Sequence, residues 1–451
     1  MRRRLHTAMV ALALALCALG WAAAAGVAGP RGRASAASAG ARERASAASR
    51  LLVGVNTVNA SYGALPAEAD RAIALARSLH AGAVRTDVPW AVFEPLEAEH
   101  MAPQALAFED RLVADAASAG IRVIMDVDGT PCWASSAPTP LLGGCRPGSE
   151  SAANSWPPVN VASYAAFVAY LARRYGPSLA AIEVWNEPDQ ANEAYWAGPE
   201  KVARYAALLR AAYPAIKAAD PSVPVLAGSL VGSNGAFLRL LYADGIKGYY
   251  DGLSVHYYTM TLNDVRAIHE TQLANGDNKP LWLDEFGWTS CLPHEQIEQE
   301  QQCVTAKVQA RNLSDTLRAL ARAPFVAAAV VYKLQDSRGE DFGMLSTSGA
   351  RKPSFAAFAG AMSAPFGPIS PVTLRLRRRG GHVLATGSGP VGDVMRMEAF
   401  QGKVLRFWAT FGLSRFNEYS IALPAVLGTH GLRVRVFQYW SGPPKAAQKT
   451  I

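Results

Sequence analysis

The chain has 451 residues, 50% of them hydrophobic and 18% charged, which excludes a disulfide-stapled miniprotein and leaves room for a large buried core. Its formal net charge of +8 is unevenly distributed, because residues 1–50 carry +7 and residues 366–451 carry +9, which leaves −8 for residues 51–365. The acidic central part speaks against nucleic acid as a partner, whereas the basic ends keep contact with an anionic wall or membrane surface open.

Residues 1–25 have the pattern of an export signal. Three arginines, Arg2 to Arg4, precede an apolar run from Ala8 to Ala25 that ends in small residues. The run is also long enough to remain as a membrane anchor. Residues 26–50 are mostly Ala, Ser, Gly and Arg without an apolar period, which is typical of a flexible linker. We therefore expect a secreted or cell-envelope protein whose folded part begins near residue 51.

From residue 51 onwards, short aliphatic runs alternate with longer stretches of helical period, which predicts βα units. Eight strands are expected, at 51–56, 83–86, 122–127, 181–185, 223–227, 252–256, 280–284 and 326–332. Helices are expected between them, at 68–80, 108–119, 164–175, 202–219, 236–243 and 304–322. Eight alternations favour a closed (β/α)8 TIM barrel over residues 51–365. An open doubly wound sheet is disfavoured because the turn after the first strand lacks a glycine-rich phosphate loop.

Past residue 365 the pattern changes to short alternating strands separated by turn signals such as Gly380-Gly381. The runs 404–408 and 432–437 predict a small β-sandwich accessory domain at residues 366–451. Three roles stay open for it: to bind a glycan, to cover the barrel, or to contact an anionic surface through Arg375, Arg377, Arg378 and Arg379.

Four cysteines outside the export signal form two local pairs, Cys132 with Cys145 and Cys291 with Cys303. In an exported chain they predict two disulfides, and loop-closure entropy favours the local pairing. A zinc site is the alternative, because His294 stands at ligand spacing from Cys291, but that loop offers no clear fourth ligand. We therefore expect no metal ion.

Polar residues gather where the predicted strands end, which is where barrels of this kind place their chemistry. Glu187 and Glu285 lie 98 positions apart, and each follows a short apolar run. Taken singly, these residues could be structural acids or a satisfied core histidine, and Glu183 is expected to be structural. The strand-end set consists of Arg85, Asn186, Glu187, His256, Tyr258, Glu285, Tyr332 and Lys333.

Cleavage of an acetal explains why such residue types would occur together. A carboxylic acid must protonate the leaving oxygen, and a carboxylate about 5 to 5.5 Å away must meet the oxocarbenium-like carbon, with retention of configuration through a covalent intermediate. The two groups therefore need different surroundings. We expect Arg85 and Tyr258 to hold Glu285 ionised, and burial near Trp185 to keep Glu187 protonated.

The ordered set Arg85, Asn186-Glu187-Pro188, His256-x-Tyr258 and Glu285 resembles clan A of the glycoside hydrolases over residues 51–363. Within the clan, the segments 129–134, 332–336 and 342–345 are most similar to families 39 and 5, which hold xylosidases, cellulases and exopolysaccharide hydrolases. The resemblance implies a (β/α)8 retaining glycosidase that uses no metal or organic cofactor.

By this resemblance Glu187 is the acid/base and Glu285 the nucleophile. Asn186 would contact the sugar 2-hydroxyl, while Arg85, Tyr258 and His256 would support the pair. The expected partner is a carbohydrate, an oligo- or polysaccharide, and the protein is expected to be a monomer.

The sugar itself stays open, because many clan members place a tryptophan at the end of strand eight where this chain has Tyr332-Lys333. Trp90, Trp133 and Trp288 are candidate stacking platforms, since a flat ring buries the apolar face of a pyranose. Ordinary loop packing is the alternative for each of them.

Two other functions remain open. One is a wall-associated carbohydrate-binding barrel that has lost catalysis, against which the intact pair of glutamates argues. The other is a transglycosylase with the same site, because the sequence does not distinguish water from a sugar as the acceptor.

Overall fold

The computed structural model describes residues 51–57, 65–232, 235–258, 262–291, 303–363, 370–390, 394–414, 417–438 and 446–451. The predicted export signal, the predicted linker and His294 lie outside the described residues.

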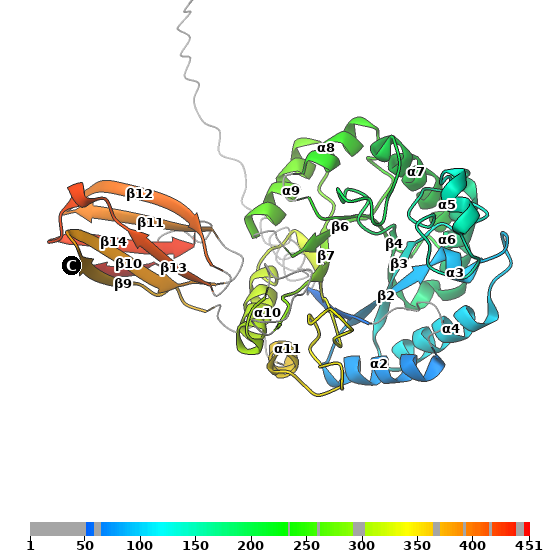
Figure 1. Ribbon diagram of the computed structural model, residues 1–451, viewed down its shortest axis with the longest axis horizontal. Helices are drawn as coiled ribbons and strands as arrows, with labels where there is room; N and C mark the ends of the chain where they lie inside the picture. The colour runs from blue at the N-terminus through cyan, green and yellow to red at the C-terminus, as the bar shows by residue number, and fades with distance from the viewer. Residues whose placement is uncertain are drawn as a thin grey trace, which may run out of the picture. The chain divides into compact units, whose positions relative to one another are not determined.

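Eight parallel strands close into a barrel in sequence order, as predicted, and β8 pairs with β1 through Val53 and Ala329. Figure 1 shows this ring of strands surrounded by helices. All six residues of β4, β5, β6 and β7 are buried, which agrees with the continuous apolar runs expected for strands that are covered on both faces. The strands are β1 (Leu52–Asn56), β2 (Ala83–Pro89), β3 (Arg122–Asp128), β4 (Leu179–Val184), β5 (Val225–Leu230), β6 (Gly252–Tyr257), β7 (Leu281–Phe286) and β8 (Val326–Val331).

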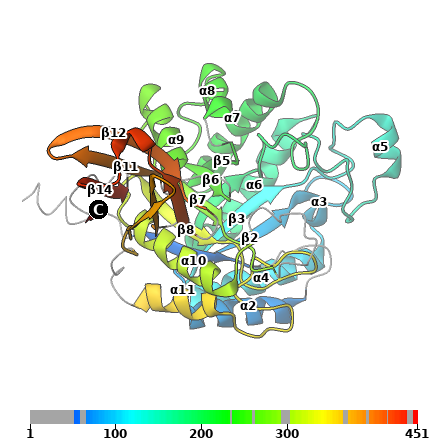
Figure 2. The same cartoon turned by 60° about the vertical axis from the view of Figure 1, so that its left-hand side comes forward.

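The helices around the barrel each bury an apolar stripe, and several begin at an identifiable cap. Asn160 accepts a hydrogen bond from the Ala162 N–H at the start of α6, and Thr305 does the same for Val308 at the start of α10. The sequence did not predict α3, α5 and α9 (Figure 2). The helices are α2 (Pro66–Ser78), α3 (Trp90–Phe93), α4 (Pro103–Ser118), α5 (Thr139–Gly144), α6 (Val161–Tyr175), α7 (Lys201–Ala219), α8 (Ala236–Ala243), α9 (Leu262–Ala274), α10 (Ala306–Leu320) and α11 (Pro353–Ser363), with the 3-10 turns η1 (Gly176–Ser178) and η3 (Ala425–Leu427).

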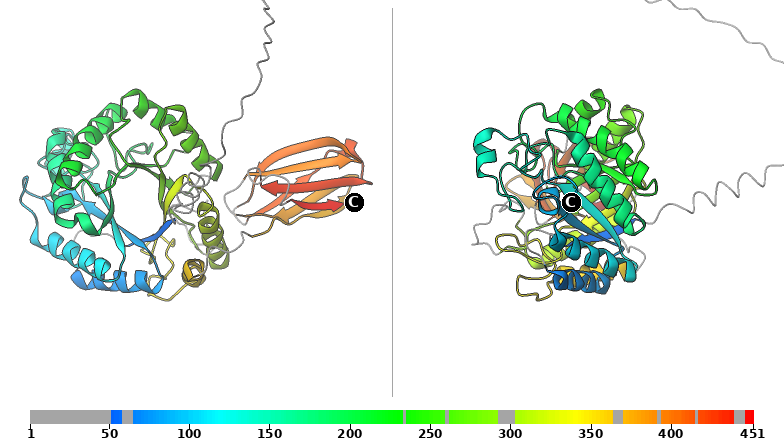
Figure 3. Two further views of the ribbon diagram at one scale, coloured as in Figure 1. Left: turned by 180° about the vertical axis from the view of Figure 1, so that it is seen from behind. Right: turned by 90° about the vertical axis from the view of Figure 1, so that its right-hand side faces the viewer.

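The C-terminal part, orange to red in Figure 3, consists of two antiparallel sheets. Their strand orders are β13-β10-β9 and β12-β11-β14-β15. Alternate residues of both sheets, such as Val383, Met397 and Val434, form one apolar core between them, as expected for a sandwich. The strands are β9 (Arg375–Arg379), β10 (His382–Ser388), β11 (Val394–Gln401), β12 (Val404–Gly412), β13 (Glu418–Ala422), β14 (Leu432–Gln438) and β15 (Ala447–Thr450).

Two disulfides join the local cysteine pairs. Cys132 and Cys145 have their Cα atoms 5.8 Å apart, and Cys291 and Cys303 have theirs 5.4 Å apart, both within the usual range for a disulfide. None of the helices that the structure describes combines the length and the apolar character that crossing a bilayer requires.

Candidate active site

Strands β2, β6 and β7 and the turn after β4 bring four of the predicted residues together. Arg85, Glu187, His256 and Glu285 are all buried, with no more than 8% of their surface exposed. One carboxylate oxygen of Glu187, one of Glu285 and a ring nitrogen of His256 all lie within 4.8 Å of one another. Two residues that are distant in the sequence thus form one carboxylate pair.

Glu285 is held as an acceptor by several donors. Arg85 Nη1 donates to Oε1 over 2.6 Å, and the Tyr258 hydroxyl donates to Oε2 over 2.6 Å. Asn56, at the end of β1, places its amide nitrogen 3.5 Å from Oε1. The guanidinium and the hydroxyl thus hold both carboxylate oxygens of Glu285 in a fixed position.

Glu187 has different partners. His256 Nδ1 lies 2.7 Å from Oε1, and the amide of Gln190 donates to Oε2 over 2.5 Å. His256 Nδ1 also lies 3.5 Å from Oε2 of Glu285, so the ring stands between the two carboxylates. The two glutamates therefore differ in environment, although they share one histidine.

The turn that delivers Glu187 adopts an unusual backbone conformation. Trp185 has a φ of 75° and Glu187 a φ of 43°, both in the left-handed region that residues with a side chain rarely adopt. Trp185 is fully buried against Tyr164 and Trp196, and its Nε1 donates to the carbonyl of Tyr195. Its ring therefore anchors this turn in the core and has no exposed face for a sugar.

Beneath the carboxylate pair, Arg85 is surrounded by acids. Its Nε donates to Glu183 over 2.9 Å, and its Nη2 donates to Asp126 over 2.9 Å and to the Asn186 side-chain oxygen over 3.1 Å. Burial opposes a charge on Glu183, but Arg85 outweighs it and lowers the pKa of Glu183 to about 2. The structural role expected for Glu183 is thus to hold Arg85 in place.

Asp284 precedes the predicted nucleophile and is fully buried. Ser254 donates a short hydrogen bond to its Oδ1, whereas Oδ2 has no donor within hydrogen-bond distance among the described residues. Burial, together with the negative charge of Glu183, raises the pKa of Asp284 well above its ordinary value. A proton on Asp284 makes it a donor towards Glu183, so we interpret the two as a carboxyl–carboxylate pair.

The charge of His256 follows from its neighbours. Burial lowers its pKa, but Glu285 and Glu187 together outweigh burial and raise the pKa of His256 to about 9. The imidazole is therefore cationic at neutral pH, and its Nδ1–H donates to Glu187.

Two groups of described residues have the spacing of metal ligands, Glu183 with His256 and Asp284, and Glu187 with His256 and Glu285. Both groups lie within reach of the Arg85 guanidinium, which already bonds to Glu183 and Glu285. A cation at either place would have to share these oxygens with Arg85, so the donor set fits hydrogen bonding better than metal ligation.

The predicted stacking platforms do not share one environment. Trp90 is fully buried against Tyr164 and Phe167, so the structure removes it from the candidates for sugar stacking. Trp133 is 37% exposed, and its Nε1 donates to the carbonyl of Glu94. Trp288 is half-buried on Phe286.

At the end of β8, Tyr332 lies edge-on to Tyr258, with their ring centroids 5.8 Å apart. Tyr258 in turn donates to Glu285, so Tyr258 links Tyr332 to Glu285. The Tyr332 hydroxyl donates to Glu340 over 3.2 Å. Lys333 is buried and pairs with Glu340, and its Nζ also donates to Ser337 over 2.6 Å. The lysine charge is therefore already neutralised within this loop.

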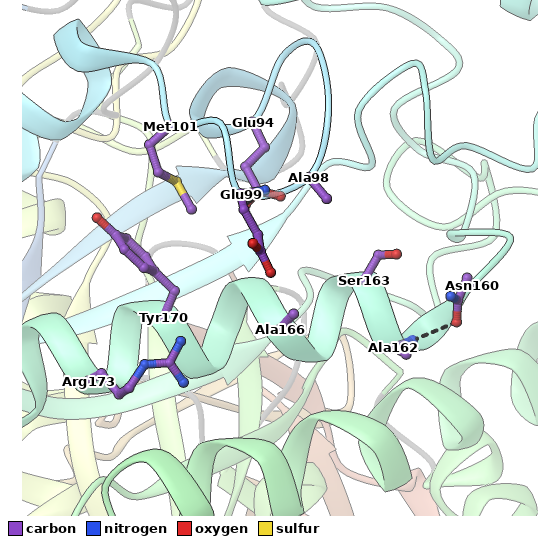
Figure 4. A pocket seen from close by; sticks show the side chains of 10 residues that line it. All are labelled: Glu94, Ala98, Glu99, Met101, Asn160, Ala162, Ser163, Ala166, Tyr170 and Arg173. Atoms are coloured by element: carbon purple, nitrogen blue, oxygen red, sulfur yellow. Dashed lines mark hydrogen bonds between the residues drawn. The ribbon is translucent and has the colours of Figure 1, made fainter.

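A cavity of about 590 Å³ lies along α6, away from the carboxylate pair (Figure 4). The carboxylate of Glu94 at its wall is already bonded to the Trp90 indole and to the Glu99 N–H, and burial raises its pKa. The residues that line the cavity do not include either member of the carboxylate pair, so the volume of the cavity does not identify the site of the chemistry. The cavity is lined by Glu94, Ala98, Glu99, Met101, Asn160, Ala162, Ser163, Ala166, Tyr170 and Arg173.

Sequence reasoning missed five residues around the site: Asn56, Asp126, Gln190, Ser229 and Asp284. Asn56 is the last residue of the predicted strand 51–56, so the strand-end signal could have found it. Asp126 lies inside a predicted strand, where the sequence does not show which way a carboxyl points. Ser229 and Asp284 lie at irregularities in the register of β5 and β7, which the sequence pattern does not show.

Solved structures similar to the chain are themselves glycosidases. A family 39 glycoside hydrolase from Bacteroides cellulosilyticus WH2 has a TM-score of 0.53 at 20% identity, with 83% of this chain and 82% of that one covered. A family 39 β-xylosidase from Caulobacter crescentus has a TM-score of 0.51 at 18% identity, with 78% and 82% covered. A family 30 endoxylanase from Clostridium papyrosolvens C71 has a TM-score of 0.50 at 12% identity, with 86% and 97% covered. At these identities the likeness shows a common fold.

None of the curated proteins compared with the chain matches it. The family model described as cellulase, glycosyl hydrolase family 5, matches residues 47–319. This match covers more than half of the 451 residues and contains Arg85, Glu187 and Glu285. The chain therefore belongs to the cellulase family, glycosyl hydrolase family 5, and is a glycoside hydrolase.

Proposed function

We propose that the protein is an exported retaining β-glycoside hydrolase that cleaves the O-glycosidic bonds of an oligo- or polysaccharide. The observation that carries this proposal is the short gap between Glu187 and Glu285, whose oxygens lie within 4.8 Å together with His256. Retaining enzymes hold their carboxyl groups about 5 to 5.5 Å apart, whereas inverting enzymes need about 6.5 to 9.5 Å to admit a water molecule. The short gap favours double displacement.

In the first step, a carboxylate oxygen of Glu285 attacks the anomeric carbon. The bond from that carbon to the leaving oxygen breaks, and the leaving oxygen takes a proton from Glu187. In the second step, Glu187 takes a proton from water, the water oxygen attacks the anomeric carbon, and Glu285 departs as a carboxylate. Asn186 accepts from Arg85 through its side-chain oxygen, so its amide N–H groups are left for the sugar 2-hydroxyl.

The proton for the leaving oxygen belongs to the Glu187–His256 pair. The two groups are 2.7 Å apart, close enough for one proton to be shared between them. Substrate that covers the pair would exclude water from it. Because an ion pair without water costs more free energy than a neutral pair, the proton would then move to Glu187.

Replacement of Glu285 by alanine tests the nucleophile. We expect Glu285→Ala to abolish turnover of an aryl β-glycoside, because no carboxylate remains to attack the anomeric carbon. Added azide should restore the reaction and give a glycosyl azide of inverted anomeric configuration, which NMR identifies. Glu109→Gln is the matched control, since it removes another buried carboxylate and should keep full activity. Undiminished turnover by Glu285→Ala would overturn the assignment.

Replacement of Glu187 by alanine tests the acid/base. A substrate with a good leaving group needs little protonation, so Glu187→Ala should cleave a dinitrophenyl glycoside at least about a hundredfold better, relative to the unchanged protein, than it cleaves a natural disaccharide. The measurement is kcat/KM for both substrates across a leaving-group series. Equal losses for the two substrates would contradict the acid role.

The export part of the proposal rests on the sequence of residues 1–25 and on the two disulfides, which form in oxidising compartments. N-terminal sequencing of protein secreted from its native host should begin near residue 26. Recovery of an uncut N-terminus in the membrane fraction would instead indicate a retained anchor.

A further inference from the structure

The outer face of the β12-β11-β14-β15 sheet carries an unusual set of side chains. Along β11, Met395, Met397 and Ala399 point into the sandwich core, so the residues between them point outwards. The register places outward residues of β12 and β14 beside them. We call this set the arginine–aromatic face; it consists of Arg396, Phe400, Trp408, Arg433, Arg435 and Phe437.

Cations and rings alternate across this face. The Arg396 guanidinium lies 4.8 Å from the centre of the Trp408 ring, and those of Arg433 and Arg435 lie 4.6 and 4.9 Å from the centre of Phe400. Phe400 is only 8% exposed, whereas Trp408 is 56% exposed. The arginines therefore cover the phenylalanine, and most of the tryptophan remains open to solvent.

Glu398 holds two of these arginines in place. Arg396 Nε donates to one of its oxygens over 2.9 Å, and Arg435 Nε donates to the other over 2.6 Å. Arg433 makes no ion pair with any residue that the structure describes. The three arginines of the face are thus accompanied by one anion, Glu398. The face lies on a part of the chain, residues 366–451, whose net charge is +9.

This combination fits one chemical class of ligand. An exposed indole offers a flat surface to the C–H side of a pyranose, and a guanidinium offers paired N–H donors to a carboxylate. Because Glu398 and the rings fix the arginines before binding, little side-chain entropy is lost when they meet a ligand. Single-stranded nucleic acid would stack on several exposed rings, and here one ring of the face is widely exposed.

We propose that the arginine–aromatic face binds an anionic polysaccharide. One sugar ring lies on Trp408, and carboxylates of neighbouring residues along the glycan pair with Arg433 and with the remaining N–H groups of Arg396. The face anchors the enzyme to an acidic glycan matrix, while the catalytic pair acts on its own substrate. The proposal does not depend on the roles of Glu187 and Glu285, because none of its residues belongs to the barrel.

The test is fluorescence anisotropy of a labelled oligogalacturonide titrated with the full chain at low and at physiological salt. Trp408→Ala should weaken binding at least about tenfold through loss of the stacking surface, and Arg433→Gln severalfold through loss of an ion pair. Two matched controls should bind as the unchanged protein does. Val426→Ala removes a 90% exposed apolar side chain from the same part of the chain, and Arg377→Gln removes an exposed arginine from β9 in the other sheet.

Three results would overturn the proposal. Equal weakening by Arg377→Gln and Arg433→Gln would mean that net charge alone is sensed. Equal binding of a neutral labelled cello-oligosaccharide would remove the anionic requirement. Binding to vesicles of anionic phospholipid that is lost in Trp408→Ala, without binding of the oligogalacturonide, would indicate a membrane surface. Arg433→Gln carries the test if Trp408→Ala does not fold, and unaltered aryl glycoside hydrolysis by each variant shows that the barrel is intact.

Discussion

Arg85 joins the predicted nucleophile to a layer of buried acids. Its guanidinium contacts Glu285 on one side and Glu183 and Asp126 on the other. The residues at the strand ends could be predicted from the sequence, because a polar residue after an apolar run is a visible signal. Of the acids below them, Glu183 was predicted to be structural but without a partner, and Asp126 was not predicted, since a carboxyl inside a strand is indistinguishable in sequence from one that faces solvent.

The proposed proton on Asp284 can be tested by substitution. If Asp284 carries a proton, its Oδ1 accepts from Ser254 and its O–H donates to Glu183, and an asparagine can reproduce both bonds. Asp284→Asn should therefore keep kcat/KM within about threefold and the free energy of unfolding within about 1 kcal/mol. Asp284→Ala should lose more of both, because it leaves Ser254 without its partner and opens a void.

Glu183→Gln is the counterpart of that substitution. Glu183 is ionised and bonded to Arg85, so its neutral amide should destabilise the protein by about 3 kcal/mol, because the buried guanidinium loses one of its paired carboxylates. Urea unfolding and kcat/KM, measured for both Asp284→Asn and Glu183→Gln, show which of the two carboxyls carries the proton. A larger loss in Asp284→Asn than in Glu183→Gln would show that the proton is on the other carboxyl.

At the scale of the elements, the alternation of strands and helices is visible in the sequence because each type of element buries apolar residues with its own period. The predicted strands start or end within three residues of the observed ones. The register shifts in β5 and β7 were not predictable, because a bulge adds a residue without changing the apolar pattern. The shift in β7 lies at Asp284 and Glu285, two neighbours that both take part in the buried network.

Helix α4 gives a prediction with a pH dependence. Glu109 lies in its buried stripe, and neither carboxyl oxygen has a hydrogen-bond partner among the described residues. Burial raises its pKa to about 8. A carboxyl whose pKa is higher in the folded than in the unfolded state binds more protons when folded, so its contribution to stability falls as the pH rises from about 4.3 towards 8.

Glu109→Gln removes this titration. The unchanged protein should lose on the order of 4 kcal/mol of unfolding free energy between pH 5 and pH 8 through this group, and the variant should lose correspondingly less. Urea unfolding at several pH values measures the slope. Glu270→Gln, on an exposed position of α9, is the control and should leave the slope unchanged. The same slope in Glu109→Gln and in the unchanged protein would show that Glu109 is ionised when buried.

For the whole molecule, the cysteine pairing was predictable from loop length alone, because the two partners of each pair are 13 and 12 positions apart. The sheet order of the C-terminal part was not, since short alternating runs do not specify which strands are neighbours. The arginines of β9, which stood out in the sequence, lie on the sheet opposite the arginine–aromatic face.

Loss of the Cys132–Cys145 disulfide should lower the free energy of unfolding by about 3 kcal/mol, the loop-closure value for a loop of this length. The double variant Cys132→Ser, Cys145→Ser and the unchanged protein can be compared by urea unfolding without reductant. A variant with serine at all four positions should not respond to added dithiothreitol, which separates reduction from other effects. An unchanged midpoint in the double variant would mean that the loop is already ordered without the bond.

The left-handed backbone at Trp185 and Glu187 bears on how this enzyme can be improved. A non-glycine residue held in that region costs about 1 to 3 kcal/mol, so the turn that presents Glu187, the proposed acid/base, is under local strain. Glycine at position 187 would relieve that strain and remove the proposed proton donor in the same step. A selection for thermal tolerance alone therefore favours inactive variants at this position. Directed evolution of this protein requires turnover to be screened in every round.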